Sequence, residues 1–226
     1  MKRTVEAKFN YFLGIIPVRL HLRNDLHLIR KSWHMVMGLV IAFCYLAGVP
    51  QDTGVILLSF FLGLDLFLES ARLQSAHFNG KVLKFWAPFM RAHEVSQMST
   101  IPHYLASVIL AIALFPKPVA VLSILYLACG DPIASLFGIL YGHKGPKLGR
   151  NKTLVGTLAG VMVCSVLTFI FLKTMSIPYP TILALSVVGG LAGGTAELLP
   201  FEVDDNFTIP VISGFVMWFA FMVVGI

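Results

Sequence analysis

The sequence predicts an all-α integral membrane protein, a polytopic bundle of about seven transmembrane helices, with six to eight as the range. Of the 226 residues, 57% are hydrophobic and only 12% are charged, about half the charged fraction of an ordinary soluble domain. The mean hydropathy is +0.83. Apolar runs of about twenty residues, the length that crosses a bilayer, recur from residue 32 to the C-terminus. A soluble enzyme and a large multidomain protein are therefore excluded.

Polar breaks divide the chain into seven apolar segments, which we take as the spans. In order, they are residues 32–49, 53–68, 100–115, 118–142, 153–173, 180–199 and 209–226. The second and third are short for about 30 Å of hydrocarbon and need flanking residues to cross it. Residues 1–31 contain no run long enough to span, so we expect a cytoplasmic or interfacial N-terminal segment without a cleaved signal peptide. Residues 32–226 then form a single transmembrane domain.

The basic residues predict the orientation of these spans. All but two of the 17 Lys and Arg precede the first span or fall in residues 69–99 and 143–152, which alternate spans place on one face. Only Lys117 and Lys173 fall on the other face. The positive-inside rule puts the N-terminus and the loops 69–99, 143–152 and 200–208 in the cytoplasm, and the C-terminus outside. Topology explains the net positive charge, so we expect no nucleic-acid partner.

Acidic side chains in and beside the spans are candidates for function, because a charge in lipid is costly. Asp131 lies in the middle of the fourth span and Glu197 near the end of the sixth. Asp204 and Asp205 follow on the predicted cytoplasmic loop. Carboxylate oxygens are ligands that Mg²⁺ prefers, so these four residues are the predicted metal ligands.

The sequence Gly130-Asp131-Pro132 predicts a break in the fourth span. Asp is a favoured N-cap, Pro is favoured at the first helical position, and Gly permits the turn before them. A helix that restarts at Asp131 would direct free amide groups toward a phosphate, with a metal ion between the phosphate and the carboxylate. The alternative is a proline kink with a satisfied Asp131.

Basic residues near the same face are candidates for binding phosphate, and without a ligand they are positive-inside anchors. They are Arg30, Lys31, Lys144, Lys147, Arg150 and Lys152. The last four belong to a glycine-rich loop, which can hold a polyphosphate although no P-loop motif is present. Metal ligands, phosphate binders and a membrane body together predict phosphoryl or nucleotidyl transfer from a nucleoside triphosphate to a lipid.

Glycines recur at helical spacing in three of the spans, as in Gly130, Gly138 and Gly142 of the fourth. Small residues let helices approach closely in lipid. The spacing does not tell whether they pack helices within one chain or between the chains of a homodimer.

Five short patches, in order along the chain, resemble the CTP-dependent lipid kinases, namely dolichol kinase, phytol kinase and the CTP-using diacylglycerol kinase. They are Arg30-Lys31-x-x-His34, Gly130-Asp131-x-x-Ala134-x-x-x-Gly138, Lys152-Thr153-x-x-Gly156-Thr157, Ala196-Glu197 and Asp204-Asp205-Asn206-x-x-Ile209-Pro210. The resemblance covers residues 30–210. It implies a membrane enzyme that moves the γ-phosphate of CTP onto the hydroxyl of a polyprenol, dolichol, phytol or diacylglycerol with a divalent cation. Val155 departs from the pattern, because many members carry Glu there.

The resemblance also suggests roles for individual residues. Asp131 or Asp204 is the candidate acceptor of the lipid hydroxyl proton, and Lys152 joins them as a catalytic candidate. Gly138 is expected beside the nucleotide phosphates, and His34 and Asn206 are further site candidates. Neither the lipid acceptor nor the choice of CTP over ATP is readable from the residues alone.

Two alternatives remain at this point. A phosphatidate cytidylyltransferase uses CTP but attacks its α-phosphate, and its DRxD-type acidic signature is absent, since the matching region reads Val203-Asp204-Asp205-Asn206. A small membrane transporter also uses intramembrane carboxylates and broken helices. Such a protein needs polar residues toward both faces, whereas here they gather toward one.

Overall fold

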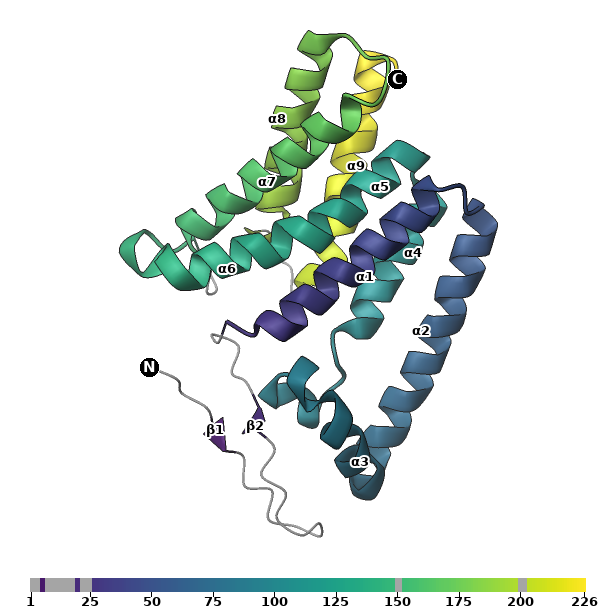
Figure 1. Ribbon diagram of the computed structural model, residues 1–226, viewed down its shortest axis with the longest axis vertical. Helices are drawn as coiled ribbons and strands as arrows, with labels where there is room; N and C mark the ends of the chain where they lie inside the picture. The colour runs from purple at the N-terminus through teal and green to yellow at the C-terminus, as the bar shows by residue number, and fades with distance from the viewer. Residues whose placement is uncertain (1–4, 7–18, 21–25, 149–151, 199–202) are drawn as a thin grey trace.

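The computed structural model describes residues 5–6, 19–20, 26–148, 152–198 and 203–226, and their arrangement is shown in Figure 1. Among these residues the regular elements are helices, apart from an antiparallel pair of two-residue strands, β1 and β2. Its strands are Val5–Glu6 and Arg19–Leu20. The interfacial stretch expected before residue 19 lies mostly outside the described residues.

The long helices coincide with the predicted spans. They are α1 (Leu28–Leu46), α2 (Gln51–Gln74), α4 (Ile101–Leu114), a continuous helix made of α5 (Lys117–Leu125), the π-helical turn η3 (Tyr126–Gly130) and α6 (Asp131–Tyr141), and then α7 (Leu154–Leu172), α8 (Tyr179–Thr195) and α9 (Asp205–Val224). The shorter elements are α3 (Ala76–Trp86) and the 3₁₀ turns η1 (Ala87–Phe89), η2 (Ala92–Val95), η4 (Gly142–Lys144) and η5 (Ala196–Leu198).

Five helices of the described chain are long and apolar enough to cross a membrane, and α4 is a shorter apolar helix. The five are α2, the continuous helix from α5 to α6, α7, α8 with η5, and α9. Arg30 and Lys31 in the first turns of α1 lower its hydropathy, although it is as long as α7. The prediction of an all-α polytopic membrane bundle is confirmed.

The predicted break at Gly130-Asp131-Pro132 is wrong in form, because the chain stays helical through it. Asp131 has φ −61° and ψ −50°, and its amide donates to the carbonyl of Tyr126, five residues earlier. Pro132 has no amide hydrogen and its ring would clash with a carbonyl four residues before it, which a π-helical turn avoids. Asp131 is therefore not an N-cap, and its own amide is not free for a phosphate.

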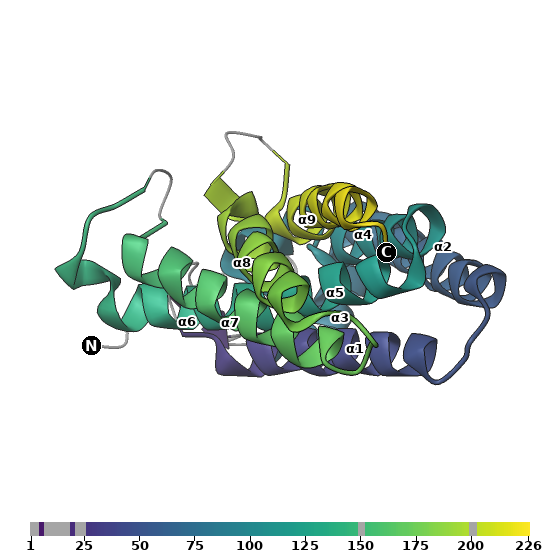
Figure 2. The same ribbon diagram turned by 90° about the horizontal axis from the view of Figure 1, so that it is seen from above.

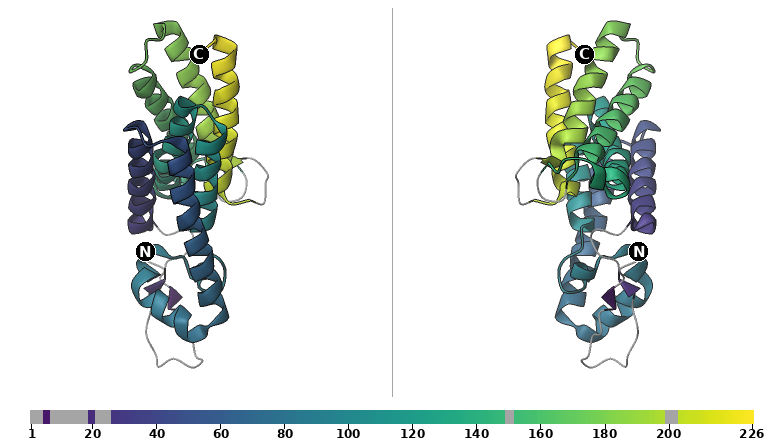
Figure 3. Two further views of the ribbon diagram at one scale, coloured as in Figure 1. Left: turned by 90° about the vertical axis from the view of Figure 1, so that its right-hand side faces the viewer. Right: turned by 90° about the vertical axis from the view of Figure 1, so that its left-hand side faces the viewer.

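The centre of the bundle is α5 with η3. Val119, Leu122, Tyr126 and Leu127 have no exposed surface. Figure 2 shows α5 between α1 and α9, and both of these helices contact it. Figure 3 shows α3 at the opposite end of the molecule from the α7–α8 connection. The buried helix thus carries Asp131 to the middle of the fold, where α8 and α9 also converge.

Glycines bring α6, α7 and α8 into close contact. A Cβ on Gly156 would lie 2.7 Å from the carbonyl oxygen of Ala134 and 3.1 Å from the Cα of Gly138. Gly160 faces Gly194 of α8 in the same way, with 3.5 Å between its added Cβ and that Cα. The glycine stripes therefore serve packing within one chain, and a homodimer remains a prediction without support from them.

The replacement Gly194→Ala tests this packing. Its Cβ would lie 2.6 Å from the Cα of Val161 and closer still to the amide nitrogen, so backbone must move. We expect a destabilisation of about 1–3 kcal/mol, typical of overpacking, seen as a lower melting temperature in detergent. In the matched control Gly63→Ala the new methyl meets nothing within 4 Å. A wild-type melting temperature for Gly194→Ala would contradict the close approach of α7 and α8.

Candidate active site

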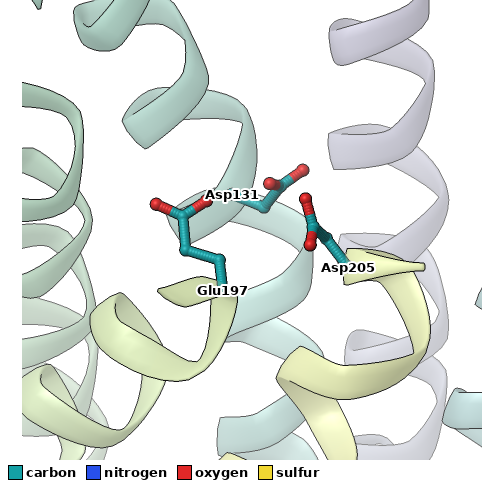
Figure 4. A group of neighbouring side chains, drawn as sticks. All are labelled: Asp131, Glu197 and Asp205. Carbon is teal, nitrogen blue, oxygen red and sulfur yellow. The ribbon is translucent and has the colours of Figure 1, made fainter. Parts of the chain in front are cut away.

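Three carboxylates from distant parts of the chain meet at one point of the bundle. Asp131 begins α6, Glu197 lies in η5, and Asp205 lies in the first turn of α9. One oxygen of each lies within 4.8 Å of the others, and Figure 4 shows the three side chains converging. Such a cluster is stable only when positive charge lies beside it.

Lys152 supplies that charge. Its Nζ donates to Glu197 Oε2 and, at 2.7 Å, to Asp205 Oδ2. Thr153 caps α7 by accepting a hydrogen bond from the amide of Gly156, which fixes the backbone next to the lysine. Burial by itself would lower the pKa of Lys152, but the three carboxylates outweigh burial and raise the pKa above its ordinary value. The direction of this shift favours the charged form of Lys152.

Lys31 approaches the same cluster from α1. Within the part of the chain that the structure describes, its Nζ is buried and has no hydrogen-bond partner. It lies within electrostatic range of Asp131 and of Arg91. A buried ammonium group without a partner is costly, so this geometry is suited to an anionic ligand that completes its bonding.

Arg30, the neighbour of Lys31, is used differently from its prediction as a phosphate ligand. Its guanidinium forms two hydrogen bonds with Glu94, at 2.7 and 2.9 Å, and further ones with the Phe89 carbonyl and the Thr100 hydroxyl. Burial would raise the pKa of Glu94, but Arg30 and the amide of Arg91 outweigh it and lower that pKa. The ion pair joins α1 to the segment before α4.

The second acidic residue of the Asp204-Asp205 pair reaches the cluster, and the first does not. Asp204 is the N-cap of α9 and accepts from the backbone amide of Asn206 at 2.9 Å and from its side chain. The carbonyl of Asn206 accepts from the Ser107 hydroxyl at 2.7 Å. His34 lies edge-on to Tyr104, with ring centroids 4.8 Å apart. Asp204 and Asn206 thus bond at the start of α9 and to α4, and His34 contacts Tyr104 of α4.

The remaining predicted phosphate binders lie around the α6–α7 connection. Lys147 is exposed, and its backbone pairs with Thr153 in an isolated antiparallel bridge. Arg150 and the side chain of Lys144 lie outside the described residues. Gly138 packs against α7, so its small size serves helix contact there. Among the described side chains of this loop, only Lys152 bonds the carboxylates.

Glu94 and Ser107 are two buried polar residues to which no sequence motif gives a role. Glu94 has a side chain 1% exposed, and its partner Arg30 is 64 positions away. Ser107 lies on an apolar helix and bonds α9 from 99 positions away. No local sequence pattern predicts either contact, because the two residues of each pair are far apart in the sequence and are brought together by helix packing.

Comparisons with known proteins show which family the chain belongs to. No protein-family model matches the chain, and no solved structure matches it. The CTP-dependent diacylglycerol kinase 1 of Eremothecium gossypii is 33% identical over 207 residues, which cover 83% of this chain and 65% of that protein. The Saccharomyces cerevisiae protein of the same name is 29% identical over 206 residues, 83% of this chain and 71% of the relative.

The Schizosaccharomyces pombe protein, also named CTP-dependent diacylglycerol kinase 1, is 32% identical over 165 residues. The match covers 62% of this chain and 74% of the relative. Three relatives of one name, each aligned with most of this chain, confirm the resemblance carried by the five sequence patches. The chain belongs to the family of the CTP-dependent lipid kinases.

Proposed function

We propose that the chain is a lipid kinase that transfers the γ-phosphate of CTP to the hydroxyl of a diacylglycerol. Three relatives are named CTP-dependent diacylglycerol kinase 1. The observation that carries the proposal is the meeting of Asp131, Glu197 and Asp205 with Lys152. Near them lies Lys31, whose Nζ is buried and has no hydrogen-bond partner among the described residues. Both signs of charge are thus present where a metal–triphosphate needs them.

The donor set of the cluster fits Mg²⁺. All three side chains offer hard carboxylate oxygens, and their atoms lie within 4.8 Å of one another. Opposite ligands of an octahedral Mg²⁺ are about 4.2 Å apart, since each bond is about 2.1 Å. Bound to Asp131, Glu197 and Asp205, the ion would supply charge neutralisation on the phosphoryl group that moves. Asp204, already committed as a helix cap, is not needed as a ligand.

The chain's own cations complete the proposed phosphate site. Phosphoryl transfer requires in-line positioning and neutralised charge more than covalent chemistry. Lys31 offers three donors from α1, and Lys152 offers a positive charge from the loop before α7. Arg30 holds the first turn of α1 through Glu94 and so positions Lys31. Lys147 is the exposed cation of the same loop and is proposed to meet the outer phosphates.

The lipid hydroxyl must lose its proton, and Asp131 is the better of the two predicted acceptors. Asp204 Oδ1 already accepts two hydrogen bonds from Asn206. Lys152 bonds Glu197 and Asp205, and it makes no such bond to Asp131 among the contacts described. Asp131 is therefore proposed as the carboxylate that faces the lipid acceptor.

An aromatic cluster at the start of α1 is suited to the level of the lipid headgroups. Trp33 lies 5.5 Å from Phe89 and 6.3 Å from Trp86, between ring centroids. Tryptophan is enriched where the bilayer meets water. We infer that the carboxylate cluster lies near this boundary on the cytoplasmic side, where a diacylglycerol hydroxyl and CTP can both reach it.

Transfer of label from CTP tests the proposal. Purified full-length chain with Mg²⁺ is given γ-labelled or α-labelled CTP and, in turn, diacylglycerol, prenols or phosphatidate. We expect label from the γ-position only, on diacylglycerol. Label from the α-position on phosphatidate would establish a cytidylyltransferase instead. If neither CTP nor ATP labels any lipid, the kinase proposal is wrong and transport becomes the function to test.

A further inference from the structure

Lys152 lies at the carboxylate cluster, at the position where a divalent cation would bind. Lys152 bonds Glu197 and Asp205, two of the three residues proposed to hold the metal. We propose that Lys152 is a built-in counter-ion, which neutralises the cluster before the metal binds and moves to the nucleotide phosphates when metal and CTP bind together. This inference rests on the proposed function and adds how the site changes on binding.

Charge balance is the first argument. Three carboxylates with oxygens within 4.8 Å of one another repel strongly, and the Glu197 side chain is only 6% exposed, so water screens it little. The ammonium group of Lys152 offsets one of these three negative charges, and Lys31 lies within electrostatic range of Asp131. The carboxylates still outnumber these two cations, so the cluster keeps a net negative charge that attracts a metal ion. Lys152 thus allows the three carboxylates to lie together without a metal ion, and the cluster still attracts the metal.

Competition for the same atoms is the second argument. The ammonium group lies 2.7 Å from Asp205 Oδ2 and also bonds Glu197 Oε2. A metal ion held by the same carboxylates would repel it at short range. Without a new anionic partner, the lysine therefore opposes metal binding. With CTP present, the triphosphate supplies that partner.

The backbone around Lys152 allows this exchange without refolding. Its carbonyl accepts from the amide of Leu148 at 2.9 Å, and Thr153 is fixed as the cap of α7. The side chain itself is 21% exposed, more than that of Glu197. A lysine stem has four rotatable bonds, so the ammonium group can turn toward the phosphates while the main chain stays in place.

Binding of Mn²⁺ alone, without nucleotide, tests the inference on the detergent-purified full chain by electron paramagnetic resonance. We expect Lys152→Gln to bind Mn²⁺ at least about tenfold more tightly than the wild type, because the competing charge is gone. Without metal its melting temperature should fall, and Mn²⁺ should restore it. The control Lys84→Gln removes an exposed charge of α3 and should change neither value.

The outcomes separate this inference from the proposed function. Suppose that the wild type binds Mn²⁺, that Asp131→Asn abolishes this binding, and that Lys152→Gln binds Mn²⁺ no more tightly than the wild type. This result overturns the counter-ion role alone. If Asp131→Asn leaves Mn²⁺ binding intact, or no protein binds Mn²⁺, the metal site of the proposed function is wrong and this inference falls with it.

A second variant covers the case in which Lys152→Gln does not fold. The double variant Lys152→Gln with Asp205→Asn removes one positive and one negative charge together. We expect its melting temperature in metal-free buffer to return to within a few degrees of the wild type. A double variant that stays unfolded would contradict the counter-ion role.

Discussion

The variant Asp131→Asn is expected to lose at least about 10³-fold in the rate of γ-phosphate transfer while remaining folded. The amide keeps the size of the carboxylate but removes its negative charge. It therefore binds a metal ion more weakly and can no longer accept a proton. One negative charge fewer in a cluster within 4.8 Å relieves repulsion. We therefore expect the melting temperature in detergent to stay level or rise, as is common where an active site is strained for function.

A matched control separates this effect from the effect of removing a carboxylate elsewhere in the protein. Asp52→Asn removes a charge from the exposed first turn of α2, far along the chain from the cluster. Its transfer rate should equal that of the wild type. If Asp131→Asn keeps more than a tenth of the wild-type rate, Asp131 neither holds the metal nor accepts the proton.

The bundle could be predicted from the sequence because lipid imposes a simple length rule. Twenty apolar residues between polar breaks must be helical, and α7 and α9 begin within four residues of the predicted segments 153–173 and 209–226. The π-helical turn at Asp131 could not be predicted. Gly, Asp and Pro favour an N-cap locally, but packing of α5 and α6 in one buried line keeps the helix continuous.

The candidate site could be predicted by residue type more than by position. Three of the four predicted carboxylates meet in one cluster, because buried acids in lipid have few other uses. Asp204 and Asp205 are adjacent and chemically alike, yet the start of α9 makes the first a cap and turns the second to the cluster. Helix geometry decides between them, and the sequence does not show where α9 begins.

Replacement of Arg30 has the second large expected effect. It tests whether Arg30 binds phosphate or forms a structural ion pair. Arg30→Met leaves Glu94, 1% exposed, as a buried charge without its guanidinium partner. Breaking a buried pair in this way costs about 3–5 kcal/mol. We expect a large fall in melting temperature, and activity should fall with it because α1 then no longer holds Lys31 in place.

The double variant Arg30→Met with Glu94→Gln makes the test specific. Removing both charges avoids the unpaired carboxylate, so the melting temperature should recover most of its loss. If Arg30 acts only by keeping the start of α1 packed, removal of the unpaired charge lets α1 repack. The transfer rate per folded molecule then recovers as well, and the KM for CTP stays near its wild-type value. Recovered stability with a KM for CTP still raised tenfold or more would mean that Arg30 contacts phosphate directly. The guanidinium already donates hydrogen bonds to Glu94, Phe89 and Thr100. For that reason we expect the double variant to recover both its melting temperature and its transfer rate.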